Sequence, residues 1–324
     1  MPVRLLVVLG PQVFGVFLVL LAITRNLQTS VLALAFLGAC VYHFRIAPVS
    51  EKAVEAVLGR SRVVGHRGAS RQAPENTIAA IRTAKKNGAD SVEFDLEYTK
   101  DGVPILLHDD TVDRTTDGTG NIKDLTFAEV QQLDAAAKHP EASKFKGERI
   151  PTLEEAVKES LQLGMVMYID VKRLPDNSAE TLHTLFQKYP GLYQSAVVVS
   201  FLPEVIYKIR SEDPAIVTAL TWRPRVISYV SVDGEPRYTQ TWKHVMHSVL
   251  DVVFEYVLHY WLWYIEGVSA VNINNHCISR EYVKFWADRG CRMLVWTVND
   301  QDEKDFFSNT LGVIYMTDDL PPQS

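Results

Sequence analysis

Two long apolar runs open the chain and predict a membrane anchor. Residues 5–24 carry no charge, are rich in Leu, Val and Phe, and lie between Arg4 and Arg25. A helix needs about 20 apolar residues to cross the hydrocarbon core of a bilayer. A second apolar run, residues 31–44, ends at Arg45. We therefore expect residues 1–60 to form a membrane anchor, of one span or of two in a hairpin, followed by a linker.

The orientation of this anchor stays open. Basic residues near the two runs (Arg4, Arg25, Arg45 and Lys52) are too evenly spread for the positive-inside rule to decide it. A cleaved signal peptide is the alternative, but the first run is long and no clean small-x-small cleavage site ends it. We expect an integral protein of the plasma membrane or an endomembrane, and we leave open the side that holds the rest of the chain.

After about residue 60, short β-rich runs alternate with helical patterns. The predicted strands are 62–66, 91–98, 165–172, 196–200, 215–221, 268–274, 292–298 and 312–317. The predicted helices between them are 74–87, 151–163, 179–188, 203–211, 279–289 and 300–307. A turn at residues 100–102 makes residues 103–108 a hairpin partner of strand 91–98. Eight strands remain, most followed by a helix, which predicts an α/β fold, a (β/α)8 TIM barrel over residues 61–324.

Composition and charge narrow the class of function. The 324 residues are 47% hydrophobic, enough for a large core. The net charge is −6 and no long basic run appears, so we expect no nucleic-acid partner. The three cysteines (Cys40, Cys277 and Cys291) form no CxxC pair, so they predict neither a zinc site nor a disulfide framework.

Acidic residues gather at the ends of predicted strands, where TIM barrels place their chemistry. Glu93 and Asp95 are two apart on one strand and so face the same side. Asp170 lies near the end of the next parallel strand. Burying neighbouring carboxylates without a cation is costly. Three hard oxygen ligands suit Mg²⁺ best and Ca²⁺ second, rather than zinc.

Cationic and imidazole side chains lie on the same predicted rim. Arg67 and Lys172 supply positive charge for a phosphate. His66 closes the first strand and His108 returns along the hairpin beside Asp95, so the two histidines are candidates for general acid and base. Each piece alone also has a structural explanation, such as an internal Asp–Lys ion pair. Their placement on one rim favours a site.

Several long motifs in a fixed order carry a family resemblance. They are VVGHRGAS…APENT, GADSVEFDLEYTKDGVPILLHDDTVDRTTDGTG, IPTLEEAV, MYIDVK and VWTVND, spread over about residues 62–319. Together they resemble the glycerophosphodiester phosphodiesterases. The resemblance implies a barrel of the phosphoinositide-phospholipase-C-like type.

The resemblance also implies roles for individual residues. Metal ligands are expected at Glu93, Asp95 and Asp170, the last standing where the family more often has Glu. The acid–base pair is expected at His66 and His108, and phosphate binding at Arg67 and Lys172. Further residues are expected to line the substrate pocket or to support the site, namely Glu75, Asn76, Glu154 and Trp296; Trp296 has a core position as its alternative.

The implied activity is metal-dependent hydrolysis of glycerophosphodiesters to glycerol 3-phosphate and an alcohol, through a cyclic phosphate. Substrates such as glycerophosphoinositol, glycerophosphoethanolamine, glycerophosphocholine and glycerophospho-N-acylethanolamine stay open. Membrane lipid is an expected partner. The alternatives are a lysophospholipase D-type activity on lysophospholipids, and a barrel that serves as a membrane scaffold or binds a signalling protein.

Residues 222–267 interrupt the barrel pattern and are predicted to be a helical insertion. Its helix, 242–265, carries a polar residue every four positions, namely Lys243, His247, Asp251, Glu255 and His259. Apolar side chains line the other face, namely Val249, Val253, Phe254, Val257 and Trp261. A membrane span here would divide the barrel, so we exclude one. An ordinary packed helix and an amphipathic helix in the membrane interface both remain open.

Overall fold

The computed structural model describes residues 2–173, 178–232 and 234–322. Within them, eight parallel strands close a barrel, in the order β1-β9-β8-β7-β6-β5-β4-β2 with β1 also paired to β2. These strands are β1 (Val63–Gly65), β2 (Ser91–Tyr98), β4 (Val166–Val171), β5 (Ala196–Ser200), β6 (Val217–Trp222), β7 (Ala270–Asn274), β8 (Arg292–Trp296) and β9 (Ile314–Thr317). The short strand β3 (Pro104–Leu106) pairs antiparallel with the end of β2. The predicted TIM barrel and the predicted hairpin are both confirmed.

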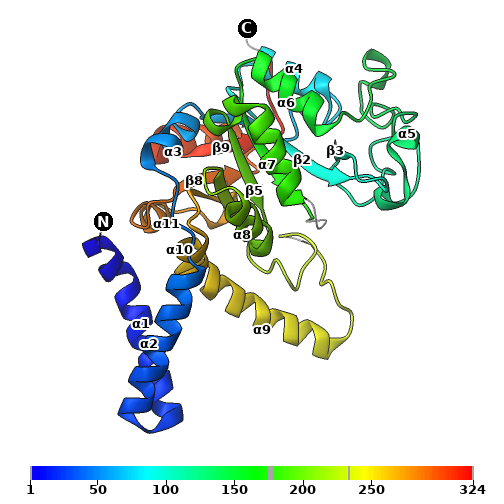
Figure 1. Ribbon diagram of the computed structural model, residues 1–324. Helices are drawn as coiled ribbons and strands as arrows, with labels where there is room; N and C mark the ends of the chain where they lie inside the picture. The colour runs from blue at the N-terminus through cyan, green and yellow to red at the C-terminus, as the bar shows by residue number, and fades with distance from the viewer. Residues whose placement is uncertain (1, 174–177, 233, 323–324) are drawn as a thin grey trace.

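Helices cover the outside of the barrel, as Figure 1 shows. They are α4 (Ile78–Lys86), α6 (Leu153–Gln162), α7 (Ser178–Lys188), η3 (Pro190–Gln194), α8 (Pro203–Glu212), η5 (Asn275–Cys277), α11 (Arg280–Ala287), α12 (Gln301–Asp305) and the π-helix η6 (Phe306–Leu311). Several begin at a side-chain cap; Thr152 and Glu155 form a capping box at the start of α6, and Asp300 caps α12.

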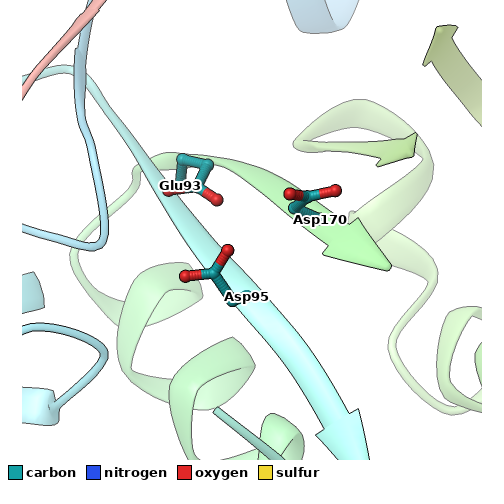
Figure 2. Close-up of side chains that lie close together, drawn as sticks. All are labelled: Glu93, Asp95 and Asp170. Atoms are coloured by element: carbon teal, nitrogen blue, oxygen red, sulfur yellow. The ribbon is translucent and has the colours of Figure 1, made fainter. Parts of the chain in front are cut away.

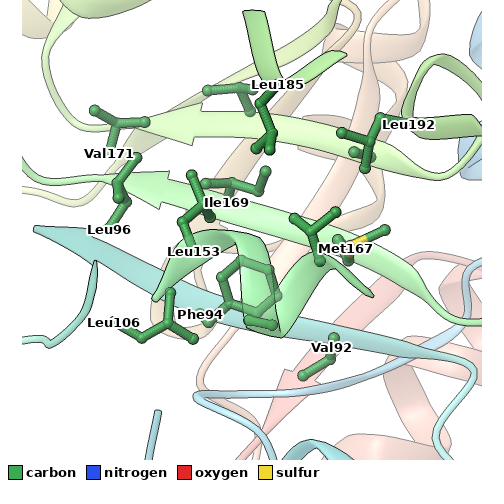
Figure 3. Close-up of a cluster of buried hydrophobic side chains, with 14 of the residues drawn as sticks. Val92, Phe94, Leu96, Leu106, Leu153, Met167, Ile169, Val171, Leu185 and Leu192 are labelled. Carbon is green, nitrogen blue, oxygen red and sulfur yellow. The ribbon is translucent and has the colours of Figure 1, made fainter. Parts of the chain in front are cut away.

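The alternation of side chains along each strand separates two apolar layers. Val92, Phe94 and Leu96 of β2 point outward into the cluster beneath α6 and α7 (Figure 3). The intervening positions point into the barrel, where Tyr168 and its apolar neighbours fill the lower part. The same alternation puts Glu93 and Asp95 on the inner side of β2, so the period of two places the acidic residues inside the barrel.

The short helix α3 (Glu51–Leu58) closes the N-terminal end of the barrel. Ser50 caps it, and its residues Val54, Val57 and Leu58 belong to the cluster that fills the barrel interior. Part of the segment expected to be a linker is therefore packed against the core.

The two N-terminal apolar runs form helices α1 (Pro2–Thr24) and α2 (Leu27–Phe44), which pack side by side and project from the barrel (Figure 1). Near the start of α1, Val8 and Leu9 pack against a core cluster of the barrel. Both are long and apolar enough to cross a membrane, with mean hydropathy of 2.3 over Val7–Thr24 and 1.5 over Leu27–Phe44. Almost none of their residues are buried. They are compatible with the expected anchor.

Two segments extend the barrel near its C-terminal rim. Residues 107–151 hold η1 (Ile122–Asp124), α5 (Phe127–Val130) and η2 (Ala142–Lys144) around a small apolar cluster of their own. The expected insertion after β6 forms a loop and then α9 (Thr241–Val257), which continues through the π-helix η4 (Leu258–Leu262) into α10 (Trp263–Glu266). The predicted helix 242–265 is thus present.

Candidate active site

Three carboxylates meet inside the barrel, as Figure 2 shows. The parallel register places Asp95 of β2 directly beside Asp170 of β4, and neighbouring strands lie only about 5 Å apart. Glu93 lies two residues before Asp95 on β2 and so on the same face of the strand, and all three side chains are buried. One oxygen from each lies within 4.8 Å of the others. The structure thus brings together the three residues expected to bind a metal.

The protonation of these carboxylates follows from burial and mutual repulsion. Burial, and then the negative charge of Asp95, raise the pKa of Glu93 to about 8. Burial acts on Asp95 in the same direction, but Lys172 and Arg67 outweigh it and hold the pKa of Asp95 far below its usual range. Lys172 and Arg67 thus offset two of the three carboxylates, and the third, Glu93, keeps its proton near neutral pH unless further positive charge is bound.

The donor set fits a divalent cation. Oδ1 of Asp170 is buried and has no hydrogen-bond partner among the residues that the structure describes. A buried polar atom without a partner is costly and calls for an explanation. A hard cation held by Glu93, Asp95 and Asp170 would supply that missing contact.

Two cations border the acidic cluster. Nζ of Lys172 lies 2.7 Å from Oδ1 of Asp95 and 2.5 Å from Oδ2 of Asp170. Nε of Arg67 lies 3.5 Å from Oδ2 of Asp95, and its Nη1 donates to Glu75 at 3.2 Å. Both residues expected to bind phosphate are therefore beside the expected metal ligands.

Each of the two histidines is paired with a carboxylate through Nδ1. Nδ1 of His66 lies 2.6 Å from Asp318, and Nδ1 of His108 lies 2.6 Å from Asp109. A carboxylate only accepts hydrogen bonds, so each Nδ1 carries the proton and each Nε2 is left for the site. Nε2 of His66 lies 4.0 Å from Oε2 of Glu93.

The two histidines differ in their electrostatic surroundings. Burial lowers the pKa of His66, but the hydrogen bond to Asp318 and the charge of Glu93 outweigh it, so the net pKa is raised. Burial dominates at His108, where Arg67 and Lys172 also act against protonation, and the pKa is lowered. No pattern in the sequence singled out Asp318 or Asp109, although both follow strands at the rim where chemistry was expected.

The loop after β1 positions Asp95, one of the expected metal ligands, through Asn76. Its Nδ2 donates to Oδ2 of Asp95 at 2.7 Å, and its Oδ1 accepts from the backbone N–H of Asp95 at 3.1 Å. Asn76 has a φ of +58°, so it belongs to a turn and not to the predicted helix 74–87. That helix begins only at Ile78 because the Thr77 side chain caps it, accepting from the Ala80 N–H.

Gly68 allows this loop to lie close to α4. Its φ is +84°, and a Cβ at this position would lie 2.5 Å from the Cβ of Ala80. The close approach lets the backbone N–H of Arg67 donate to Oε2 of Glu93 at 2.8 Å. A side chain at position 68 would collide with α4, so the HRG motif requires glycine there for steric reasons.

The remaining expected residues divide into two groups. Glu75 belongs to the site, because it pairs with Arg67 and accepts two hydrogen bonds from Arg114, at 2.7 and 2.8 Å. Glu154 does not join it: its partners in the described part of the chain are Lys158 on α6, Lys188 at the end of α7, and Tyr189 just after that helix. Arg114, which binds Glu75 here, was not among the expected site residues.

A cavity of about 890 Å³ extends from Asp170 of the acidic cluster toward the insertion. His108, Asp170 and Lys172 form its inner end, and Trp296 lines its wall. The Trp296 ring packs edge-on against Phe201, with centroids 5.5 Å apart, and its Nε1 donates to the Asn272 carbonyl. Trp296 thus lines the cavity and also packs against the apolar cluster inside the barrel. Phe254 of α9 also borders the cavity.

Comparison with known proteins agrees with this geometry. Residues 66–320 match the glycerophosphoryl diester phosphodiesterase family. The chain is 44% identical over 315 residues to glycerophosphodiester phosphodiesterase 1 of Mus musculus and of Homo sapiens, covering 96% of this chain and 95% of each relative. A glycerophosphodiester phosphodiesterase of Bacillus subtilis is 36% identical over 207 residues, 59% of this chain and 70% of that protein.

Solved structures share the fold. A phosphodiesterase of Oleispira antarctica, in complex with the product sn-glycerol-3-phosphate, matches with a TM-score of 0.61 and 26% identity over 80% of this chain and 93% of that chain. A glycerophosphodiester phosphodiesterase of Agrobacterium tumefaciens matches with a TM-score of 0.62 and 24% identity over 80% and 96%. The resemblance inferred from the motifs is confirmed: the chain belongs to the glycerophosphoryl diester phosphodiesterase family and is a phosphodiester hydrolase of that family.

Proposed function

We propose that the enzyme hydrolyses glycerophosphodiesters to glycerol 3-phosphate and an alcohol, with a divalent cation bound by Glu93, Asp95 and Asp170. The observation that carries the proposal is the buried acidic cluster, in which an oxygen of Asp170 lacks a partner among the described residues. All-oxygen ligands favour Mg²⁺ first and Ca²⁺ second. The product seen in the Oleispira antarctica relative supports glycerol 3-phosphate as the product here.

The residues around the cluster suit attack by the substrate's own glycerol hydroxyl. Arg67 and Lys172 bind and orient the phosphodiester, since both cations border the carboxylates. One of His66 and His108 accepts the hydroxyl proton as the P–O bond forms, and the other protonates the alcohol that leaves. Water then opens the resulting cyclic glycerophosphate by the reverse proton transfers. When bound, the cation would stabilise the negative charge on the phosphoryl oxygens.

The size and lining of the cavity bear on which alcohol group the substrate carries. At about 890 Å³ it has room for an alcohol larger than ethanolamine, such as inositol or an N-acylethanolamine. Phe201, Val226 and Phe254 give its wall an apolar portion. That portion favours, as a second candidate, lysophospholipase D-type activity on lysophospholipids.

The N-terminal helices are proposed to be a two-helix membrane anchor that stays attached. The base of the pair is bonded to the barrel: the Tyr207 hydroxyl donates to the Phe44 carbonyl at 3.0 Å, and the buried Arg210 donates to the Ala47 carbonyl. Helix α1 in turn packs along α2, and its residues Val8 and Leu9 pack against the barrel cluster that includes Trp263. These contacts favour an integral anchor over a signal peptide that is removed.

The test is hydrolysis of a panel of soluble glycerophosphodiesters and lysophospholipids by the purified full chain in detergent, with Mg²⁺, Ca²⁺ or EDTA. We expect release of glycerol 3-phosphate that depends on metal and is lost in Glu93→Ala. Glu154→Ala is the matched control, because this carboxylate bonds only Lys158, Lys188 and Tyr189 among the described residues. Equal activity in EDTA and Mg²⁺ would refute the metal proposal, and preferred release of choline or ethanolamine from lysophospholipids would favour the second candidate.

A further inference from the structure

Helix α9 turns an apolar face away from the protein. Large apolar side chains along one side are strongly exposed: Trp242 (65%), Val245 (55%), Val249 (57%), Val252 (68%) and Tyr256 (48%). Met246, Leu250 and Val253 are also exposed on this helix. A helix on the surface of a soluble domain has the opposite orientation, with its apolar side toward the core. Contiguous apolar surface of this kind marks a binding surface.

The polar side of the same helix is held against the protein. Asp251 is only 8% exposed and accepts hydrogen bonds from the backbone N–H groups of Ile227, at 2.7 Å, and Ser228, at 3.0 Å. His259 is buried in η4, and its Nε2 lies 2.5 Å from the Tyr282 hydroxyl. Rolling the helix to bury its apolar side would break these contacts, so the outward orientation is built into the fold.

The C-terminal end of this helical segment is joined to the base of the N-terminal hairpin. The Ile46 N–H donates to the Ile265 carbonyl at 2.8 Å, and the Arg45 guanidinium lies 4.4 Å from the centre of the Tyr264 ring. Figure 1 shows α9 and the α1–α2 pair projecting from the same side of the barrel. The segment that follows α9 is therefore fixed at the base of the most apolar part of the molecule.

We propose that the outward face of α9 docks into the lipid bilayer that holds the α1–α2 hairpin, an inference that rests on the proposed anchor. The bilayer is the occupant because an inserted hairpin brings it to the level of residues 45–46, to which α10 is bonded. Trp242 and Tyr256 are of the type that partitions to the interface. Phe254 of the same helix borders the cavity that reaches Asp170, so docking places the mouth of the active site beside the membrane.

The contact can be tested on the full chain with a fluorescent reporter at one cysteine. Val252→Cys places an environment-sensitive dye on the proposed docking face, after the three native cysteines (Cys40, Cys277 and Cys291) are replaced by serine or alanine. Lys284→Cys on α11, whose side chain is 73% exposed, is the matched control. A third chain keeps only Cys40 in α2 as a reporter of the anchor. Each is reconstituted into phosphatidylcholine vesicles with and without nitroxide-labelled lipid.

We expect a roughly twofold or greater loss of emission by nitroxide lipid at positions 252 and 40 and little change at 284. Quenching at 40 without quenching at 252 would place α9 in water and overturn the inference while the anchor stands. Absence of quenching at both would refute the anchor and the docking with it. A blue-shifted dye at 252 that lipid does not quench, together with disulfide-linked dimers of the unlabelled Val252→Cys chain under oxidising conditions, would assign the face to a second copy.

Two checks separate docking from misfolding. Each labelled chain must retain hydrolysis of a soluble glycerophosphodiester, since Val252 and Lys284 do not border the cavity. A second variant, Val249→Asp with Val245→Cys as the reporter, should lose at least half of the quenching seen with Val249 intact, because a charge opposes insertion of the neighbouring turn. Unchanged quenching in this variant would also overturn the proposal.

Discussion

Asp318 is the residue whose replacement tests the histidine geometry most directly. Its Oδ1 lies 2.6 Å from Nδ1 of His66 and accepts from the Ser70 hydroxyl at 3.1 Å, while its Oδ2 accepts from Asn299 at 2.8 Å. In Asp318→Asn, an amide that keeps accepting from Asn299 must turn its NH₂ toward His66. Nδ1 would then accept, and the proton would move to Nε2, the atom that faces the site.

The magnitude follows from the bond that is lost. A hydrogen bond to a charged partner contributes about 1.5–3 kcal/mol, which corresponds to a roughly 10- to 150-fold loss of kcat. Because Asp318 raises the pKa of His66, its loss lowers that pKa. The limb of the pH–rate profile that reports His66 should therefore move to lower pH.

The assay is steady-state hydrolysis of a soluble glycerophosphodiester from about pH 5 to 9, with kcat and KM separated. Asp319→Asn is the matched control, because Asp319 bonds Arg71 and Gln72 rather than a histidine. We expect kcat to fall in Asp318→Asn with KM nearly unchanged, and Asp319→Asn to stay near wild type. A kcat within about threefold of wild type, or an unshifted profile, would refute the positioning role.

Three further predictions concern the acidic cluster and its surroundings. In EDTA, Glu93→Gln should stabilise the protein by roughly 2–4 kcal/mol at pH 8 and by less at pH 5. The reason is that the pKa of Glu93 is higher in the folded protein than in the unfolded chain, so the metal-free wild type loses stability as the pH rises from the unfolded-state pKa toward 8. Thermal unfolding measures the difference, and equal stability of the two proteins at pH 8 would contradict the prediction. Asn76→Ala removes both hydrogen bonds to Asp95 and should weaken metal binding about 10- to 100-fold by calorimetry; unchanged affinity would show that Asp95 needs no support. Glu154→Ala should leave kcat within about twofold, because its partners are exposed lysines and Tyr189; a large loss would place it in the site after all.

The barrel was predictable because its strands are both short and strongly patterned. Strands 91–98 and 196–200 have the predicted bounds, and the other strands differ only at their ends. Caps and turns set those ends locally, and a pattern of apolar residues does not report them. The helix after β1 shows the reason: Pro74 predicted an early start, whereas the cap at Thr77 delays it. That delay leaves Asn76 in a turn, where it reaches Asp95.

The site was predictable where strand periodicity alone sets direction, and less so where loops decide. Glu93, Asp95 and Asp170 meet because β2 and β4 pair in register. Glu154 was expected on the strength of a motif, but its position on α6 directs it to Lys188 and Tyr189 instead. Asp318 was missed although it directly follows the last strand, the place where the barrel rule locates chemistry. Applying that rule to every strand end would have identified it.

Helix α9 shows what an amphipathic pattern leaves undetermined. Periodicity divides a helix into two faces but does not say which one the protein covers. Here the decision comes from the preceding loop, whose N–H groups at Ile227 and Ser228 need an acceptor and find one in Asp251. An unpaired buried N–H is costly, so this contact holds the polar side inward and leaves Val249 and Val252 outside. In water that arrangement exposes apolar surface at a loss, whereas beside a bilayer it gains both sets of contacts. The outward orientation of α9 is therefore what the proposed docking against a membrane predicts, and the strongly exposed Val252 is the position where the reporter belongs.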